Sequence, residues 1–166
     1  RADGQAGMNA DISPHELTAE RPPPSAAAPT AAAGRPAVLF LCVHNAGRSQ
    51  MAAAIFNQVA DPGKARAISA GTDPGPGVHP EVQVVMCEQG VDLTGVEPLR
   101  LTEALAHRAQ WLITMGCGDR CPFVPGAHTE DWPLDDPKGR PLDEVRAIRD
   151  EIATRVAALV DAHGWR

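Results

Sequence analysis

The sequence predicts an α/β fold with a parallel sheet, and three observations support that prediction. Residues 37–41 form a continuous apolar run of the length and β-branched content expected of a strand buried on both faces. Residues 49–59 follow with apolar residues spaced as on one face of a helix, closed by Asp-Pro-Gly at 61–63. The same order of strand and helix recurs toward the C-terminus. Strands that alternate with helices imply a parallel sheet with right-handed crossovers.

The later elements are predicted from the same periodicities. We expect short strands over 66–69 and 111–115 and helices over 80–89, 102–107 and 142–162. In the last helix one face is apolar, through Val145, Ile148, Ile152, Val156 and Leu159. Cys87 lies in the helix predicted over 80–89, where a cysteine is usually a small buried hydrophobic residue without a chemical role.

Composition divides the chain into two parts. Residues 1–36 contain Arg21-Pro22-Pro23-Pro24 and then an alanine-rich stretch, with few large apolar groups to bury. We predict a flexible N-terminal tail there. Residues 37–166 have the size and patterning of a single domain.

Charge and hydropathy exclude some partners. The net charge of −6 argues against binding to nucleic acid or to an anionic membrane surface, because such proteins carry basic patches. No apolar stretch approaches the roughly 18–20 residues needed to cross a bilayer. We therefore expect a cytoplasmic protein. In that reducing compartment the four cysteines indicate catalytic or metal-binding chemistry rather than structural disulfides.

The strongest chemical signal is the loop that follows the first strand. Cys42 and Arg48 are six positions apart, between a buried strand and the start of a helix. Such a loop turns backbone N–H groups toward one point, and the positive end of the helix dipole also favours an anion there. The Arg48 guanidinium suits two oxygens of a tetrahedral oxyanion, and Gly47 permits the close turn.

Cys42 lies at the base of this loop, where the amides that bind the anion also stabilise its thiolate. We predict Cys42 to be the nucleophile. Ser49 is expected to cap the helix and to donate a hydrogen bond to the thiolate. The residues predicted to surround the anion are Val43, His44, Asn45, Ala46, Gly47, Arg48 and Ser49. His44 either tunes Cys42 or is a bystander.

The segment from Val38 to Ala52 resembles the opening of arsenate reductases that share the low-molecular-weight tyrosine phosphatase fold. The resemblance spans about 37–163 and continues through 69–71, 114–122 and 131–137. It implies a three-layer α/β sandwich with a four-stranded parallel sheet. It also implies arsenate as the substrate, with phosphate or sulfate as competing anions, and neither a cofactor nor a bound metal.

The resemblance implies roles for three further residues. Asp136, which precedes Pro137, takes the place of the family's general acid. Cys117 and Cys121 follow the strand predicted over 111–115, so they are expected to face the same crevice as Cys42. They would resolve the arsenic adduct by a disulfide relay, with thioredoxin as the reductant. Their spacing is shorter than in thioredoxin-coupled relatives, and the order in which they act stays open.

Several alternatives remain. Cys117 and Cys121 could be half of a zinc site or inert. The chain could be a tyrosine phosphatase, although it has no Tyr and Lys138-Gly139 follow the Asp-Pro pair where phosphatases usually place aromatic residues. It could be an arsenate–mycothiol transferase, or a non-catalytic anion-binding module. Ala53 replaces an acidic residue that in some relatives accompanies a potassium ion.

Overall fold

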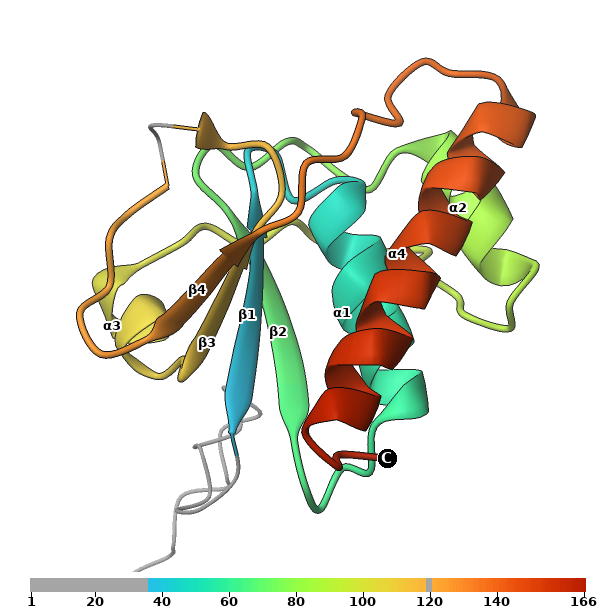
Figure 1. Cartoon of the computed structure of the whole chain (residues 1–166). Helices are drawn as coiled ribbons and strands as arrows, with labels where there is room; N and C mark the ends of the chain where they lie inside the picture. The colour runs from blue at the N-terminus through green and yellow to red at the C-terminus, as the bar shows by residue number, and fades with distance from the viewer. Residues whose placement is uncertain (1–35, 119–120) are drawn as a thin grey trace, which may run out of the picture. The chain divides into compact units, whose positions relative to one another are not determined.

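The computed structural model describes residues 36–118 and 121–166, so the predicted tail lies almost wholly outside the described residues. The tail and its boundary at residue 36 stay predictions. The described residues form four strands and four helices (Figure 1). In chain order they are β1 (Ala37–Cys42), α1 (Arg48–Val59), β2 (Arg66–Gly71), α2 (Pro80–Cys87), α3 (Glu103–His107), β3 (Trp111–Thr114), β4 (His128–Asp131) and α4 (Leu142–Ala162).

The four strands form one parallel sheet in the order β2-β1-β3-β4. Strand β1 is central: its residues Ala37–Cys42 pair with Arg66–Gly71 of β2 on one side, and Val38–Leu41 pair with Trp111–Thr114 of β3 on the other. The parallel sheet predicted from the alternating pattern is therefore confirmed. Its register places Cys42 opposite Gly71 at the carboxyl edge of the sheet.

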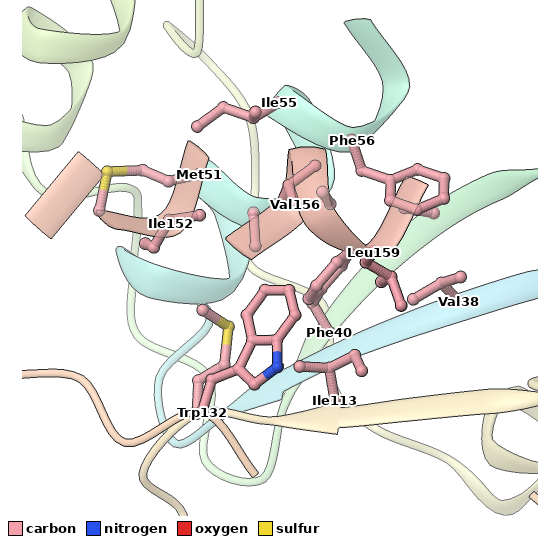
Figure 2. Packing of buried hydrophobic residues seen from close by; sticks show 14 of the residues in the cluster. Val38, Phe40, Met51, Ile55, Phe56, Ile113, Trp132, Ile152, Val156 and Leu159 are labelled. Carbon is pink, nitrogen blue, oxygen red and sulfur yellow. The ribbon is translucent and has the colours of Figure 1, made fainter. Parts of the chain in front are cut away.

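The helices cover the two faces unequally, which gives three layers (Figure 1). Helices α1, α2 and α4 pack on one face, and the short α3 lies on the other. On the three-helix face, the ring of Phe40 contacts those of Phe56 and Trp132, with centroids 6.0 and 5.6 Å apart (Figure 2). Met51, Ile152 and Val156 complete the contact between helices and sheet. This layer holds β1 and α1 in place, and with them the loop between the two.

The opposite face has a smaller core. Leu39, Leu41 and Leu112 point to this side and pack against Ala106 of α3 and against Val124. Successive residues of β1 alternate between the two cores, as they must in a strand. Both faces of β1 are buried, which explains the uninterrupted apolar run in its sequence.

Strand β4 was not predicted from the residues themselves. Its sequence, His-Thr-Glu-Asp, has no apolar alternation, and three of its four side chains are exposed. It lies at the edge of the sheet, where a strand needs only one hydrogen-bonded neighbour. The resemblance alone implied a four-stranded sheet, and that implication is confirmed.

Most boundaries fall within two residues of those predicted. The prediction that Cys87 is buried is wrong, because α2 turns Val82, Val85 and Met86 inward and leaves Cys87 exposed at its end. Helix α3 begins one residue late because Thr102 caps it, its side chain accepting a hydrogen bond from the Leu105 amide at 3.1 Å. None of the described helices is long and apolar enough to span a membrane.

An ion-pair network joins α2 to α4. Glu88, directly after α2, accepts hydrogen bonds from Arg146 at 2.8 Å and from Arg149 at 2.8 Å. The hydrogen bond from Arg146, followed by that from Arg149, lowers the pKa of Glu88 to about 2. Arg149 also donates to the Val85 carbonyl at 2.8 Å. The pairing ties the C-terminal end of α2 to the first half of α4.

Candidate active site

The candidate active site lies where β1 passes into α1. Cys42 is the last residue of β1 and is buried, with a free thiol. The next five residues turn the chain into α1, whose first backbone hydrogen bond runs from Met51 N to Gly47 O at 3.0 Å. We call residues 42–49 the oxyanion loop.

The carbonyl groups of the oxyanion loop are directed outward. Four of them accept hydrogen bonds from the segment 72–79: Thr72 N to Cys42 O (3.2 Å), Asp73 N to Val43 O (2.7 Å), Gly75 N to His44 O (3.0 Å) and His79 N to Ala46 O (2.9 Å). The carbonyl and amide of one trans peptide unit point in opposite directions. The amides that follow these carbonyls are therefore turned toward the inside of the loop, where an anion would be bound.

Asn45 fixes the shape of the loop. It has the left-handed φ of 50°, which asparagine tolerates better than most residues, and its amide N donates to Cys42 Sγ at 3.3 Å. Its side chain is completely buried: Oδ1 accepts from Leu99 N at 2.8 Å and from Gln50 Nε2 at 2.9 Å. Gln50 also donates to the Asn45 carbonyl at 3.1 Å. One side chain thus joins the oxyanion loop to α1 and to the segment that precedes α3.

The Ser49 side chain contacts the Cys42 sulfur and does not cap the helix. Gly47 occupies the N-cap position of α1 and makes no side-chain cap, so the predicted capping role of Ser49 is wrong. Ser49 Oγ lies 2.8 Å from Cys42 Sγ and accepts a hydrogen bond from Asn45 Nδ2 at 2.8 Å. Because that lone pair is already used, the hydroxyl proton is free to point at the sulfur and stabilise a thiolate.

Arg48 is buried beside the loop and held from two other segments. Its Nη1 donates to the Leu134 carbonyl at 3.0 Å. A Cβ atom added at Gly116 would collide with the same Nη1. Gly116 also has a φ of +91°. The position of the guanidinium therefore depends on a glycine at the end of β3 and on the segment after β4.

Pro137, the neighbour of Asp136 in the chain, is the residue of this segment that packs against the oxyanion loop. Pro137 is buried against Gly47, where an added Cβ would meet its ring at 2.8 Å. Asp136 itself is exposed, and its Oδ1 accepts from Lys138 N at 3.0 Å. Arg140 Nε donates to the Asp136 carbonyl at 2.8 Å. The Asp-Pro segment thus lies against the start of α1 with its carboxyl group at the surface.

Cys117 and Cys121 are paired with each other in a disulfide, with Cα atoms 5.5 Å apart. Cys117 is buried in the α3-side core, and its sulfur lies 4.0 Å from the carbonyl oxygen of Leu41, the residue before Cys42. Cys121 is only half-buried. One sulfur of the disulfide therefore lies close to the end of β1, and the other lies nearer to solvent.

The remaining predicted residues fall around the same loop. Val43 and His44 are half-buried, and His44 Nδ1 lies 2.9 Å from the Asp73 carbonyl. Ala46 is buried. Among the described residues, no group of three His, Cys, Asp or Glu could hold a metal ion.

Sequence reasoning missed residues that support the loop from a distance. Gln50 and Leu99 bind Asn45, and Leu134 and Gly116 hold Arg48. Gly71 leaves room for the loop, because an added Cβ would lie 2.7 Å from Val43 O. Leu99, Leu134 and Gly116 act through backbone atoms or through a missing side chain, so only the glycine offers a signal in sequence.

A free, buried cysteine in a loop of inward amides, an arginine beside it and an Asp-Pro segment against the helix start are the elements of a phosphatase-like oxyanion site. The model of the low molecular weight phosphotyrosine protein phosphatase family matches residues 37–163, and the chain belongs to that family.

Within the family, the similar proteins include arsenate reductases. The thioredoxin-dependent arsenate reductase of Corynebacterium glutamicum is 39% identical, with a TM-score of 0.68 over 79% of this chain; the match spans 63% of that longer chain. A Halobacterium salinarum relative named "Putative arsenate reductase" is 36% identical over 126 residues, 74% of this chain and 89% of its own length. The glutaredoxin arsenate reductase of a Synechocystis species is 33% identical over 126 residues, 74% of this chain and 95% of its own length.

Proposed function

We propose that this chain is an arsenate reductase in which Cys42 attacks arsenate and Cys117 and Cys121 carry the resulting oxidation away. The observation that carries the proposal is the Cys117–Cys121 disulfide beside the end of β1. A phosphatase returns its thiol unchanged and needs no such pair, whereas a reductase must oxidise two thiols for each arsenate. The names of the similar proteins support the same activity.

The first step is displacement at arsenic. The Cys42 thiolate, which receives hydrogen bonds from Ser49 and from the Asn45 amide, forms an S–As bond while one arsenate oxygen departs. The inward amides and Arg48 hold the remaining oxygens, as they would those of phosphate or sulfate. Asp136 supplies the proton that lets the oxygen leave as water.

The second step reduces the arsenic. A Cys117 thiolate attacks Cys42 Sγ, the S–As bond breaks, and its electron pair stays with arsenic, which leaves as arsenite. Cys121 then attacks Cys117 Sγ, which frees the Cys42 thiolate and forms the Cys117–Cys121 disulfide. The pairing of Cys117 with Cys121 in the structure supports this last step. A dithiol protein such as thioredoxin reduces it, so we place the reaction in the reducing cytoplasm.

The runner-up function is phosphate ester hydrolysis, which uses the same Cys42, Arg48 and Asp136. The family's description favours it. It leaves the cysteine pair without a purpose, and an arsenate–mycothiol transferase would do the same. A non-catalytic anion site would gain nothing from a thiolate that repels its ligand.

One set of assays distinguishes these activities. We expect arsenate-dependent NADPH oxidation with thioredoxin and thioredoxin reductase, and little hydrolysis of aryl phosphates. If the protein turned over only with mycothiol, or only hydrolysed aryl phosphates, the proposal would be wrong.

Variants of the cysteine pair test the order of the relay. Cys117→Ser should form the arsenic adduct on Cys42 but release arsenite poorly. Cys121→Ser should complete one turnover and stall as a Cys42–Cys117 disulfide, visible by mass-spectrometric mapping. Cys87→Ser is the matched control, because Cys87 is a free, exposed cysteine away from the loop. If the phenotypes of the two relay variants were reversed, the order of Cys117 and Cys121 would be reversed as well.

A further inference from the structure

Phe123 is the most exposed of the large apolar side chains in the described part of the chain. The protein has three phenylalanines, of which Phe40 and Phe56 are fully buried and Phe123 is 87% exposed. An exposed aromatic ring forgoes the free energy of burial, about 25 cal/mol for each Å² of apolar surface left in water. Single exposed apolar residues are common on protein surfaces. Only the position of Phe123 in the molecule can therefore indicate a role for it.

Phe123 follows Cys121 by two residues, and the chain is anchored on both sides of it. Before it, Cys121 is joined by the disulfide to the buried Cys117. After it, Val124 is buried in the α3-side core and its carbonyl accepts a hydrogen bond from Ala127 N at 3.2 Å. The ring is therefore held outward by a backbone that is fixed at each end.

The two sulfurs of the disulfide differ in access. Cys117 is 5% exposed, whereas Cys121 is half-buried. An incoming thiolate thus reaches Cys121 more readily, and Cys121 is the cysteine only two residues from Phe123 in the chain. A small thiol would need only this access. A protein that brings its own cysteine to Cys121 must also dock, and an exposed aromatic side chain is a common anchor in such interfaces.

We propose that Phe123 is the anchor on which a dithiol protein reductant of the thioredoxin type docks to reduce the Cys117–Cys121 disulfide. One thiolate of the reductant attacks Cys121 Sγ, forming an intermolecular disulfide and releasing the Cys117 thiolate. The second thiol of the reductant then attacks the reductant's sulfur in this intermolecular disulfide. This step frees the Cys121 thiolate and leaves the reductant with a disulfide of its own. Two electrons and two protons pass to the cysteine pair.

This proposal rests on the proposed function for its physiological meaning, but it is testable without arsenate. The measurement is the rate at which reduced thioredoxin opens the Cys117–Cys121 disulfide of the oxidised full chain, followed by thiol labelling and mass spectrometry. Dithiothreitol is the small-molecule reference. We expect Phe123→Ser to lower the second-order rate with thioredoxin about tenfold, as for loss of a moderate interface anchor. The rate with dithiothreitol should not change.

Two further variants make the result specific. Phe123→Leu keeps an apolar anchor and should restore most of the rate, whereas Val84→Ala removes an exposed apolar side chain on α2 and should have no effect. An equal loss with thioredoxin and dithiothreitol would show that Phe123 only shapes the loop, and an unchanged rate with thioredoxin would also overturn the proposal. A normal thioredoxin effect in a protein that does not reduce arsenate would instead reject the proposed function alone.

Discussion

The two loops that follow the neighbouring strands β1 and β3 differ in how their backbones are held in place. The oxyanion loop after β1 is bonded outward through four carbonyls and pinned by the buried Asn45. The segment after β3 contains two glycines of positive φ, Gly116 and Gly118, a disulfide, and the exposed Phe123. Both begin at the carboxyl edge of one parallel sheet.

The difference follows from what each loop is proposed to do. A group of amides that binds an anion must be in place before the anion arrives, because reorganisation would cost binding energy. A cysteine pair that passes oxidation outward needs one sulfur near the nucleophile and one near solvent. Adjacent parallel strands bring the two loops close together, and Gly116 of the second loop leaves room for Arg48 of the first.

The largest expected effect comes from removing Cys42, the proposed nucleophile in the first loop. Cys42→Ser should reduce arsenate turnover to the background of the coupled assay, because a serine hydroxyl is not ionised at neutral pH. The melting temperature should stay close to that of the wild type, since the two side chains are nearly isosteric. Substantial residual turnover would place the nucleophile elsewhere.

Arg48→Lys should be nearly as severe. A lysine supplies a point charge and cannot both bind Leu134 O and grip two oxygens. We expect kcat/KM for arsenate to fall about 10²- to 10³-fold, the range for loss of one oxyanion donor. Steady-state kinetics with arsenate, with phosphate as a competitor, would measure the loss, and near-normal affinity for both anions would contradict the proposed clamp.

Two substitutions of Asn45 distinguish the contribution of backbone strain from that of hydrogen bonding in the oxyanion loop. Asn45→Gly keeps the left-handed φ at little cost but loses the bonds to Ser49, Gln50 and Leu99, so we expect a loss of about 1–3 kcal/mol in unfolding free energy. Asn45→Ala should lose about 1 kcal/mol more, because alanine is strained at that φ. Urea denaturation checks both values. Equal stabilities of the two variants would show that the φ of 50° is not a constraint.

Alanine variants of Gly116 and Gly118 test whether the loop after β3 helps to position Arg48 in the oxyanion loop. Both have positive φ, but an added Cβ meets Arg48 only at Gly116 and meets nothing within 4 Å at Gly118. Gly116→Ala should raise the KM for arsenate and lower kcat/KM by up to about 10²-fold, because it displaces the guanidinium. Gly118→Ala should cost only backbone strain of about 1 kcal/mol. Equal kinetics in the two variants would remove Gly116 from the support of Arg48.

The smallest expected effect lies outside both loops, at Glu88. Its pKa is lowered to about 2 in the folded protein, chiefly by the hydrogen bonds from Arg146 and Arg149. A lowered pKa means that the ionised carboxylate contributes stability above the unfolded value near 4.5, and that this contribution is lost as pH falls toward 2. Glu88→Gln should therefore be less stable near pH 7 and should lose less stability on acidification below pH 4.5. Parallel pH–stability curves for both proteins would contradict this assignment.

Sequence was most informative where the local pattern and the burial agree. The apolar run of β1 and the periodicity of α4 are visible because both faces of β1 and one face of α4 are buried. Strand β4 was missed because an exposed edge strand needs no apolar pattern. Cys87 was misplaced because the rotation of a short helix depends on what it packs against, and that information lies in α4.

The local geometry of the candidate site was easier to predict than the distant contacts that support it. Cys42 and Arg48 lie close in sequence, so their spacing signalled a shared loop. The contact of Asn45 with Leu99 spans 54 positions and that of Arg48 with Leu134 spans 86, and no local pattern encodes either. Ser49 shows the limit of a local rule: its residue type suits a helix cap, but the buried sulfur and Asn45 occupy its hydroxyl instead.

The positions of the three tryptophans determine which parts of the molecule intrinsic fluorescence reports on. With no Tyr and three Trp in the chain, the intrinsic fluorescence comes essentially from Trp111, Trp132 and Trp165. Trp111 and Trp165 have ring centroids 5.8 Å apart, and Trp132 packs on Phe40. Intrinsic fluorescence therefore reports on the packing of α4 against the strands. Trp132 is two residues from Leu134, whose carbonyl holds Arg48, so it is the natural optical reporter of events at the oxyanion loop.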